Sequence, residues 1–196
     1  MTPGFGRGSV VCDLSSFVLF CVHVTKGPAK REPVPKDPLV TPRRILVLGL
    51  GNTILGDDGV GILVVREMRK TWRELPHVEC MEASLGGMVL LDLVAGFDNL
   101  IVIDAIMTDD ANPPGFVYEL APGDLGDAVR PYASHVLDLQ TALELGKRLG
   151  RKMPSTVKIF AVKIEDNGIF REGLTPPVAG VLPGLARRVM ADIGEV

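Results

Sequence analysis

Aromatic residues, cysteines and long apolar or basic runs are scarce in this sequence. Only 5% of its 196 residues are aromatic, so the core must be built from aliphatic side chains. Its three cysteines, Cys12, Cys21 and Cys80, form no C-x-x-C pair, which argues against a disulfide framework or zinc knuckle and favours a reducing compartment. The absence of a dense Lys/Arg run argues against a nucleic-acid surface. Residues 14–24 are apolar but too few to span a bilayer.

The remaining composition is that of one ordinary globular domain, with 46% hydrophobic and 23% charged residues and a formal net charge of −3. The first 42 residues differ from the rest, because residues 26–42 are rich in proline and charge and resemble a linker. A signal peptide is disfavoured, since Asp13 interrupts the apolar run and no small-residue cleavage site follows. We therefore expect residues 1–42 to be disordered or dispensable, and residues 43–196 to form the functional domain, located in the cytoplasm.

The stretch from residue 43 to residue 61 organises the chain. A short apolar run, Ile45 to Leu48, predicts a buried strand, and Gly49, Gly51 and Asn52 then predict a tight turn. Two adjacent carboxylates, Asp57 and Asp58, precede a helical apolar pattern that begins at Val60. In a parallel α/β sheet such a turn lies at the carboxyl end of its strand, where these folds place their sites.

Two phosphate-binding motifs fail at this turn. The dinucleotide fingerprint would need a third glycine where Ile54 stands, and the P-loop would need its lysine where Asp57 stands. A carboxylate pair repels phosphate, so it favours a cation or simply caps the following helix.

Further along the chain, the pattern predicts alternating strands and helices. The expected helices cover about 58–74, 88–95, a segment after His135 that ends near Gly150, and a last helix capped by Thr175 and bent at Pro183. The expected strands cover 45–48, 77–83, 100–104, 116–120 and 156–164. No crossover helix fits between residues 105 and 114, so the strand at 116–120 should run antiparallel to the one before it. The result is a mixed, mostly parallel five-stranded sheet with helices on both faces.

Three polar residues could converge at the carboxyl edge of this sheet. Asp58 follows the first strand, Asp104 ends the third, and His135 is expected in the loop just before a later helix. Each could instead serve as a cap or turn residue. Two carboxylates and an imidazole suit a borderline divalent ion such as Ni²⁺ or Zn²⁺, with further coordination positions open. Neither H-E-x-x-H nor G-x-S-x-G occurs, so the residues alone indicate an open metal site without naming a reaction.

The order of these motifs resembles that of the [NiFe] hydrogenase maturation endopeptidases. The resemblance begins with G-x-G-N-x-x-x-x-D-[DE]-x-x-G and covers about residues 44–193. It is carried by Gly49, Gly51, Asn52, Asp57, Asp58, Gly61, Gly87-Met88, Asp104-Ala105, Ser134-His135 and Gly173 to Pro176.

The resemblance implies a three-layer α/β fold of the phosphorylase/hydrolase-like kind and a metal-dependent endopeptidase. It implies removal of a C-terminal peptide from the precursor of the [NiFe] hydrogenase large subunit once nickel is inserted. Asp58, Asp104 and His135 match the metal ligands and catalytic residues, and Asp57 receives a supporting role. The metal is expected to be the substrate's own nickel, for which zinc or cadmium could substitute in crystals, and the enzyme is expected to be a monomer.

Two other functions fit parts of the pattern. A receiver-like phosphoacceptor domain would use Asp57, Asp58 and Asp104 to hold Mg²⁺, with Lys163 after the last strand, but the missing crossover helix opposes it. A nickel-binding chaperone would bind the precursor without shortening it. The Gly86-Gly87 turn could admit the substrate's tail or simply connect a strand to a helix, and Gly173 to Pro176 is expected to be structural.

Overall fold

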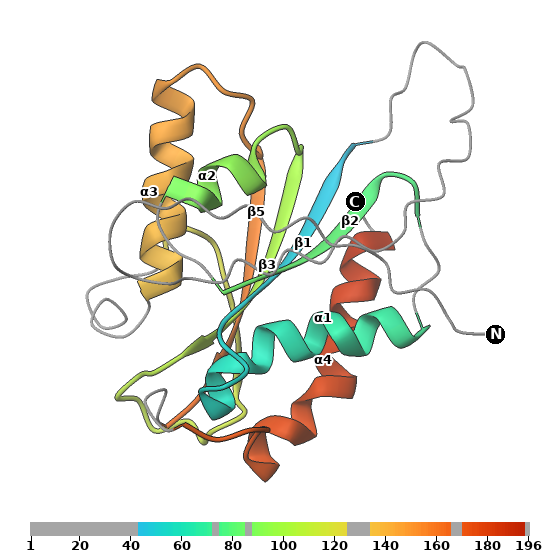
Figure 1. Cartoon of the computed structure of the whole chain (residues 1–196), viewed down its shortest axis with the longest axis vertical. Coiled ribbons are helices and arrows are strands. Elements are labelled where there is room, and N and C mark those ends of the chain that lie inside the picture. Colours follow the sequence, from blue (N-terminus) through green and yellow to red (C-terminus); the bar gives the residue numbers. More distant parts are fainter. Residues whose placement is uncertain (1–42, 72–74, 85–87, 125–133, 166–169, 195–196) are drawn as a thin grey trace, which may run out of the picture.

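A computed structural model describes residues 43–71, 75–84, 88–124, 134–165 and 170–194, which form a three-layer α/β fold (Figure 1). The N-terminal segment 1–42, the Gly86-Gly87 turn and residues 125–133 lie outside the described residues, so the expectations for them stay predictions. Within the described part of the chain, no helix has both the length and the apolar character needed to cross a membrane.

The strands form one five-stranded sheet in the order β2-β1-β3-β5-β4, in which β4 alone is antiparallel to its neighbour. The strands are β1 (Ile45–Leu50), β2 (Val78–Ala83), β3 (Asn99–Ile106), β4 (Val117–Leu120) and β5 (Thr156–Lys163). The helices are the 3₁₀ turn η1 (Gly56–Gly59), α1 (Val60–Thr71), α2 (Met88–Val94), α3 (Ser134–Arg148) and α4 (Pro176–Gly194). The predicted mixed, mostly parallel sheet is therefore confirmed.

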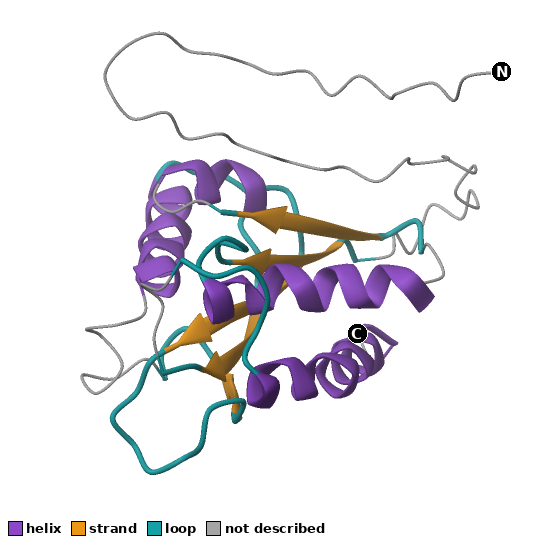
Figure 2. Cartoon of the chain, turned by 60° about the horizontal axis from the view of Figure 1, so that its bottom comes forward, coloured by secondary structure: helices purple, strands orange, loops and turns teal. Residues whose placement is uncertain are grey.

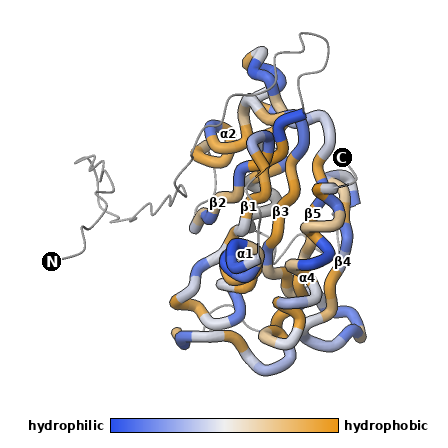
Figure 3. The backbone as a smooth tube through the Cα atoms, turned by 90° about the vertical axis from the view of Figure 1, so that its right-hand side faces the viewer, coloured by the Kyte–Doolittle hydropathy of each residue, from blue (hydrophilic) through white to orange (hydrophobic). Residues whose placement is uncertain are grey.

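Alternation along the central strands divides the core between two layers of helices. Leu46 and Leu48 of β1 pack toward α2 and α3, whereas Ile45 and Val47 pack toward α1 and α4. Figure 2 shows the two helical layers on opposite faces of the sheet, and Figure 3 shows the hydrophobic colour concentrated along its central strands. Because both faces are covered, these strands are apolar throughout rather than alternating with polar residues.

The structure corrects three details of the sequence-based prediction. β4 pairs with β5, not with β3, because the connection from β3 passes over the end of β5 to the outer side of the sheet. α1 begins at Val60, since the acidic pair itself lies in η1. α3 begins at Ser134, so His135 belongs to the helix and not to the loop before it. Pro183 lies inside α4 as expected.

The turn after β1 depends on two glycines. Gly51 has φ of +126°, and a Cβ atom there would lie 1.9 Å from the Asp58 carbonyl oxygen, so a larger residue would displace η1. A Cβ atom at Gly61 would lie 2.2 Å from the Ile103 carbonyl oxygen and 2.4 Å from that of Leu50. The start of α1 therefore rests directly on the carboxyl ends of β1 and β3, which brings η1 next to β3.

Candidate active site

The structure brings Asp58 and Asp104 together at the carboxyl edge of the sheet. Asp58 lies in η1 after β1 and is 7% exposed, and Asp104 lies near the end of β3 and is 1% exposed. The backbone N–H of Asn52 donates to Oδ2 of Asp58 at 2.7 Å and fixes this carboxylate within its turn. Asp104 accepts a hydrogen bond from the N–H of Ala105 at 2.9 Å.

The environment of Asp104 opposes its ionisation. Burial, followed by the nearby charge of Asp58, raises the pKa of Asp104 well above its ordinary value, and the Ala105 N–H offsets this only in part. Two carboxylates placed together in a buried site are unfavourable unless a proton or a cation compensates them. The pair therefore has the chemistry of a cation ligand set.

His135 lies in the first turn of α3, at the same edge of the sheet as Asp58 and Asp104. α3 is followed by β5, which begins at the opposite edge, so the first turn of α3 lies toward the carboxyl edge (Figure 1). Asp104 shares its strand face with Val102 and Ile106, which pack toward α2 and α3. The side chain of His135 lies outside the described residues, and the described side chains alone contain no metal-binding group of three His, Cys, Asp or Glu.

Asp57 joins the β1 turn to the start of α4. Its two carboxylate oxygens accept hydrogen bonds from the N–H and the hydroxyl of Thr175 at 2.6 and 2.7 Å, and it is 4% exposed. Arg171 lies 3.8 Å from the same carboxylate. The Thr175 carbonyl accepts the first hydrogen bond of α4, from Ala179, as expected of an N-cap position. Asp57 therefore fastens η1, which carries Asp58, to the start of α4, and the resemblance implies a supporting role for it.

Asn52 positions the Asp58 carboxylate, a role that the sequence motif did not by itself assign to it. Besides the bond from its N–H to Asp58, its side-chain Oδ1 accepts from the N–H of Ile54 at 3.2 Å. Such a bond to the backbone two residues on is typical of Asn in turns, so the Gly-Asn sequence itself carried the signal.

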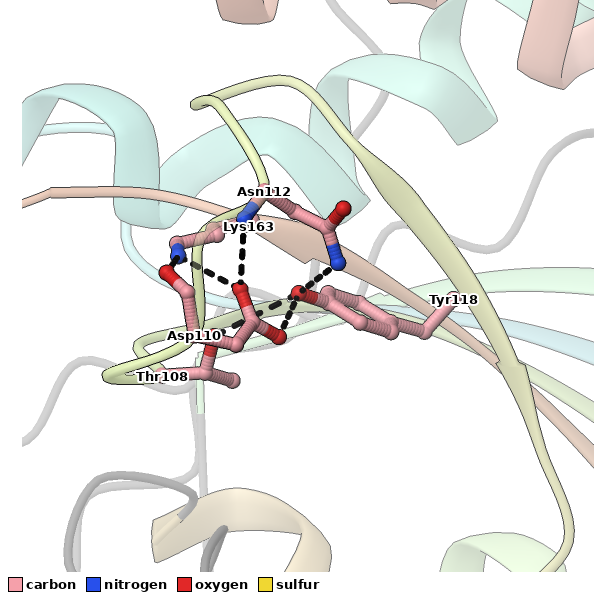
Figure 4. A network of polar contacts seen from close by, with 5 residues as sticks. All are labelled: Thr108, Asp110, Asn112, Tyr118 and Lys163. Carbon is pink, nitrogen blue, oxygen red and sulfur yellow. Dashed lines mark hydrogen bonds and ion pairs between the residues drawn. The ribbon is translucent and has the colours of Figure 1, made fainter.

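A second polar cluster surrounds Lys163 at the end of β5 (Figure 4). Lys163 is 6% exposed, and its ammonium donates to the backbone oxygen and to Oδ1 of Asp110 at 2.6 and 2.7 Å. The Tyr118 hydroxyl of β4 donates to the other Asp110 oxygen, and Asn112 and Thr108 contact the same hydroxyl. Beside this cluster lies a pocket of about 460 Å³, whose lining includes Met107, Asp109, Pro114 and Glu165.

The contacts of Lys163 within this cluster give it a structural role, so its position at the end of β5 does not require the receiver-like function. In such a domain this lysine would serve the acidic site, whereas here its ammonium fastens the loop between β3 and β4. Residues 107–116, all of which the structure describes, contain no helix, so the regular alternation of a receiver domain is broken as the sequence indicated.

We expect Asp110→Asn to lower the melting temperature at neutral pH and to have little effect in acid. Hydrogen bonds from Lys163 and then from Tyr118 hold the pKa of Asp110 far below its ordinary value of 3.8. The ionised form therefore stabilises the fold above pH 3.8, and this contribution is lost as the pH falls toward the lowered pKa. Melting curves of both proteins from pH 7 down to about pH 2 test this, because they enter the interval between the unfolded pKa of 3.8 and the lowered one. The exposed neighbour Asp109→Asn is the control, and an equal deficit at every pH would contradict the explanation.

Cysteine chemistry is not favoured at the described residues. The one cysteine among them is Cys80 of β2, and burial raises the pKa of its thiol to about 11 although Arg69 lowers it in part. A thiol with so high a pKa is protonated at neutral pH and is a poor nucleophile. Attack by Cys80 is therefore not a candidate mechanism.

Comparison with known proteins identifies the family. A family model described as hydrogenase maturation protease matches residues 62–192. The hydrogenase 2 maturation protease of Escherichia coli is 29% identical over 156 residues, covering 78% of this chain and 92% of the relative. The hydrogenase expression/formation protein HoxM of Azotobacter vinelandii is 34% identical over 166 residues, covering 80% and 75%.

Solved structures agree. The hydrogenase maturating endopeptidase HybD from E. coli superposes with a TM-score of 0.64 at 30% identity, covering 78% of this chain and 93% of that one. The [NiFe] hydrogenase maturation protease HybD from Thermococcus kodakarensis has a TM-score of 0.57 at 21% identity, covering 76% and 97%, and supports the fold.

These matches define the class of the protein as a peptidase with a three-layer α/β fold. Within that class, the chain belongs to the hydrogenase maturation protease family. Its role is that of an endopeptidase in hydrogenase maturation.

Proposed function

We propose that this endopeptidase removes the C-terminal peptide from the precursor of the [NiFe] hydrogenase large subunit after nickel has been inserted. The observation that carries the proposal is the buried carboxylate pair, Asp58 and Asp104, at the carboxyl edge of the sheet. A buried pair of carboxylates is suited to a cation, and such a site fits a substrate that brings a metal ion with it.

The proposed ligands are Asp58, Asp104 and His135. Two carboxylates and one imidazole suit a borderline divalent ion such as Ni²⁺, and three protein ligands leave coordination positions for groups of the substrate. A bound cation would also offset the repulsion that raises the pKa of Asp104, because metal binding favours the deprotonated ligand. The site would therefore bind a precursor with a finished metal centre in preference to an empty one.

The chain's part in the reaction is to hold and orient. Asn52 fixes Asp58 through its backbone N–H, and the β3 ladder fixes Asp104, so an incoming metal centre meets ligands that are already in place. The substrate's ion would polarise the scissile carbonyl or an attacking water. Nickel is thus both the mark by which the precursor is recognised and the proposed electrophile.

The test compares two forms of one precursor. Nickel-loaded and nickel-free large-subunit precursor are incubated with the protein, and their intact masses are measured before and after. We expect loss of a short C-terminal peptide from the loaded form alone. Loss from both forms would retain the protease but discard recognition through nickel. An unchanged mass in both forms would contradict the proposal, and binding without cleavage would favour a nickel-binding chaperone.

A further inference from the structure

Two large apolar side chains are exposed on the loops beside the candidate site. Ile54, in the turn between β1 and η1, is 54% exposed, and Phe170, in the loop before α4, is 81% exposed. A single exposed apolar residue is common on a protein surface, but an aromatic and a branched aliphatic residue side by side are more informative. We call this pair the apolar rim.

Backbone hydrogen bonds hold the two halves of the rim together. The N–H of Arg171 donates to the Ile54 carbonyl at 3.2 Å, and the N–H of Gly56 donates to the Arg171 carbonyl at 2.8 Å. These bonds form a parallel bridge between Leu55 and Arg171. Ile54 and Phe170 each precede a bridged residue, so they occupy matching positions in the bridge.

Asn52 and Asp57 connect the rim to the acidic site, which is formed by Asp58 and Asp104. Asn52 accepts a hydrogen bond from the N–H of Ile54 on its side chain, and its own N–H binds the Asp58 carboxylate. On the other side, Asp57 binds Thr175, four residues after Arg171, and lies 3.8 Å from the Arg171 guanidinium. The turn that orients the acidic site therefore also fixes the rim, so a chain bound on the rim would have a defined position relative to Asp58.

We propose that the apolar rim docks an extended, apolar segment of the precursor polypeptide next to the scissile bond. This rests on the proposed function, since a peptide bond delivered to Asp58 and Asp104 must be carried in by a chain that crosses the loops of this edge. The rim is continuous with that site and is open, which suits a passing polypeptide better than a small molecule. The half-exposed guanidinium of Arg171 adds a donor for carbonyl oxygens of the same segment.

In this proposal the rim contributes to binding of the precursor, whereas Asp58 and Asp104 contribute to the reaction. Apolar side chains of the precursor would remove Ile54 and Phe170 from water, which strengthens binding of the substrate and of its transition state alike. Loss of the rim should therefore raise KM and leave kcat nearly unchanged.

The test uses the double variant Ile54→Ser/Phe170→Ser in the full chain with nickel-loaded precursor. We expect KM to rise by about tenfold or more, in line with the loss of two buried apolar contacts, while kcat stays within about twofold. Phe170→Leu, which keeps an apolar side chain, should retain most of the wild-type KM. Melting curves should coincide with wild type, because both side chains are exposed.

Leu149→Ser is the matched control. Leu149 is 61% exposed but follows α3 at the opposite edge of the sheet, where β5 begins, so its loss should leave both constants unchanged. An unchanged KM in the double variant would contradict the proposal that the rim binds the precursor. A change in oligomeric state at unchanged KM would also contradict the proposal, because the rim would then be an interface between two copies of this protein.

Failure of the proposed function is read separately, from the wild type. If the wild type binds the precursor without cleaving it, the Kd of the wild type and of the double variant for surface-immobilised precursor tests the contribution of the rim. An equal Kd for the two proteins would contradict the docking proposal. A wild type that neither cleaves nor binds the precursor removes both proposals.

Discussion

Asp104→Asn is expected to abolish cleavage of the nickel-loaded precursor while making the metal-free protein more stable at neutral pH. The amide keeps the size of the side chain but removes the negative charge that would hold the cation. Loss of one such electrostatic group in a buried site costs about two to three orders of magnitude in rate. Intact-mass assays of precursor shortening over time measure the loss.

The gain in stability follows from the direction of the pKa shift. A carboxyl with a higher pKa in the folded than in the unfolded state binds its proton more tightly when folded, so ionisation above the unfolded value of 3.8 favours unfolding. This cost is absent below pH 3.8 and grows as the pH rises through the interval between the two pKa values. Asparagine does not ionise, so its advantage in melting temperature should be largest at neutral pH and disappear near pH 3.8.

Asp92→Asn provides the control for both measurements. The Asp92 carboxylate lies on α2, is 70% exposed and pairs with Arg151 on the surface. Its substitution should leave cleavage unchanged and shift the melting temperature little, because exposed ion pairs contribute little. Full activity of Asp104→Asn would remove Asp104 from the site, and a lower melting temperature at pH 7 would contradict the account of its burial.

Gly61→Ala is expected to destabilise the protein by about 3 kcal/mol or more and to reduce cleavage with it. The added methyl group would lie within 2.4 Å of two backbone oxygens, those of Ile103 and Leu50, and neither can move without disturbing β1 or β3. α1 would have to shift away from the sheet and carry η1, with Asp58, away from Asp104. Urea unfolding gives the free energy, and the precursor assay gives the activity of the fraction that remains folded.

The same substitution in a glycine that touches nothing separates packing from helix propensity. Gly180 lies in α4, and apart from its chain neighbours and the nearby backbone of its own helix, no atom lies within 4 Å of the Cβ position. Gly180→Ala should be neutral or stabilising by up to about 1 kcal/mol, because alanine is the better helix former. A cost at Gly61 no larger than at Gly180 would show that the contact between α1 and the strands is looser than the distances indicate.

Local patterns explain why so much of the site could be predicted. The apolar run of β1, the Gly-Asn turn and the acidic pair lie within one short stretch, where spacing and conformational preference are sufficient. Asp104 could be placed because it lies near the end of a strand whose parallel neighbours end at the same edge of the sheet. The placement of His135 in a loop or in a helix depends on where α3 begins, and residue spacing determines helix boundaries less well than any other feature.

Contacts between distant parts of the chain could not be predicted. The bonds from Thr175 to Asp57 join residues 118 positions apart, and those from Lys163 to Asp110 join residues 53 apart. Nothing in either local sequence specifies its partner. The predicted pairing of β4 with β3 was wrong for the same reason, since a short connection fixes the direction of a strand but not which strand it pairs with.

The insertion of β5 between β3 and β4 also constrains the order of folding. During synthesis β1, β2 and β3 can pair as soon as residue 106 has been made, because they are neighbours in the sheet. β4 is made next but has no partner until residues 156–163 follow, and the ammonium that fastens the preceding loop belongs to the last of these residues. Because β5 is the last strand to be made, β1, β2 and β3, which position Asp58 and Asp104, can assemble first, and the β3–β4 loop can be fastened only after Lys163 has been made.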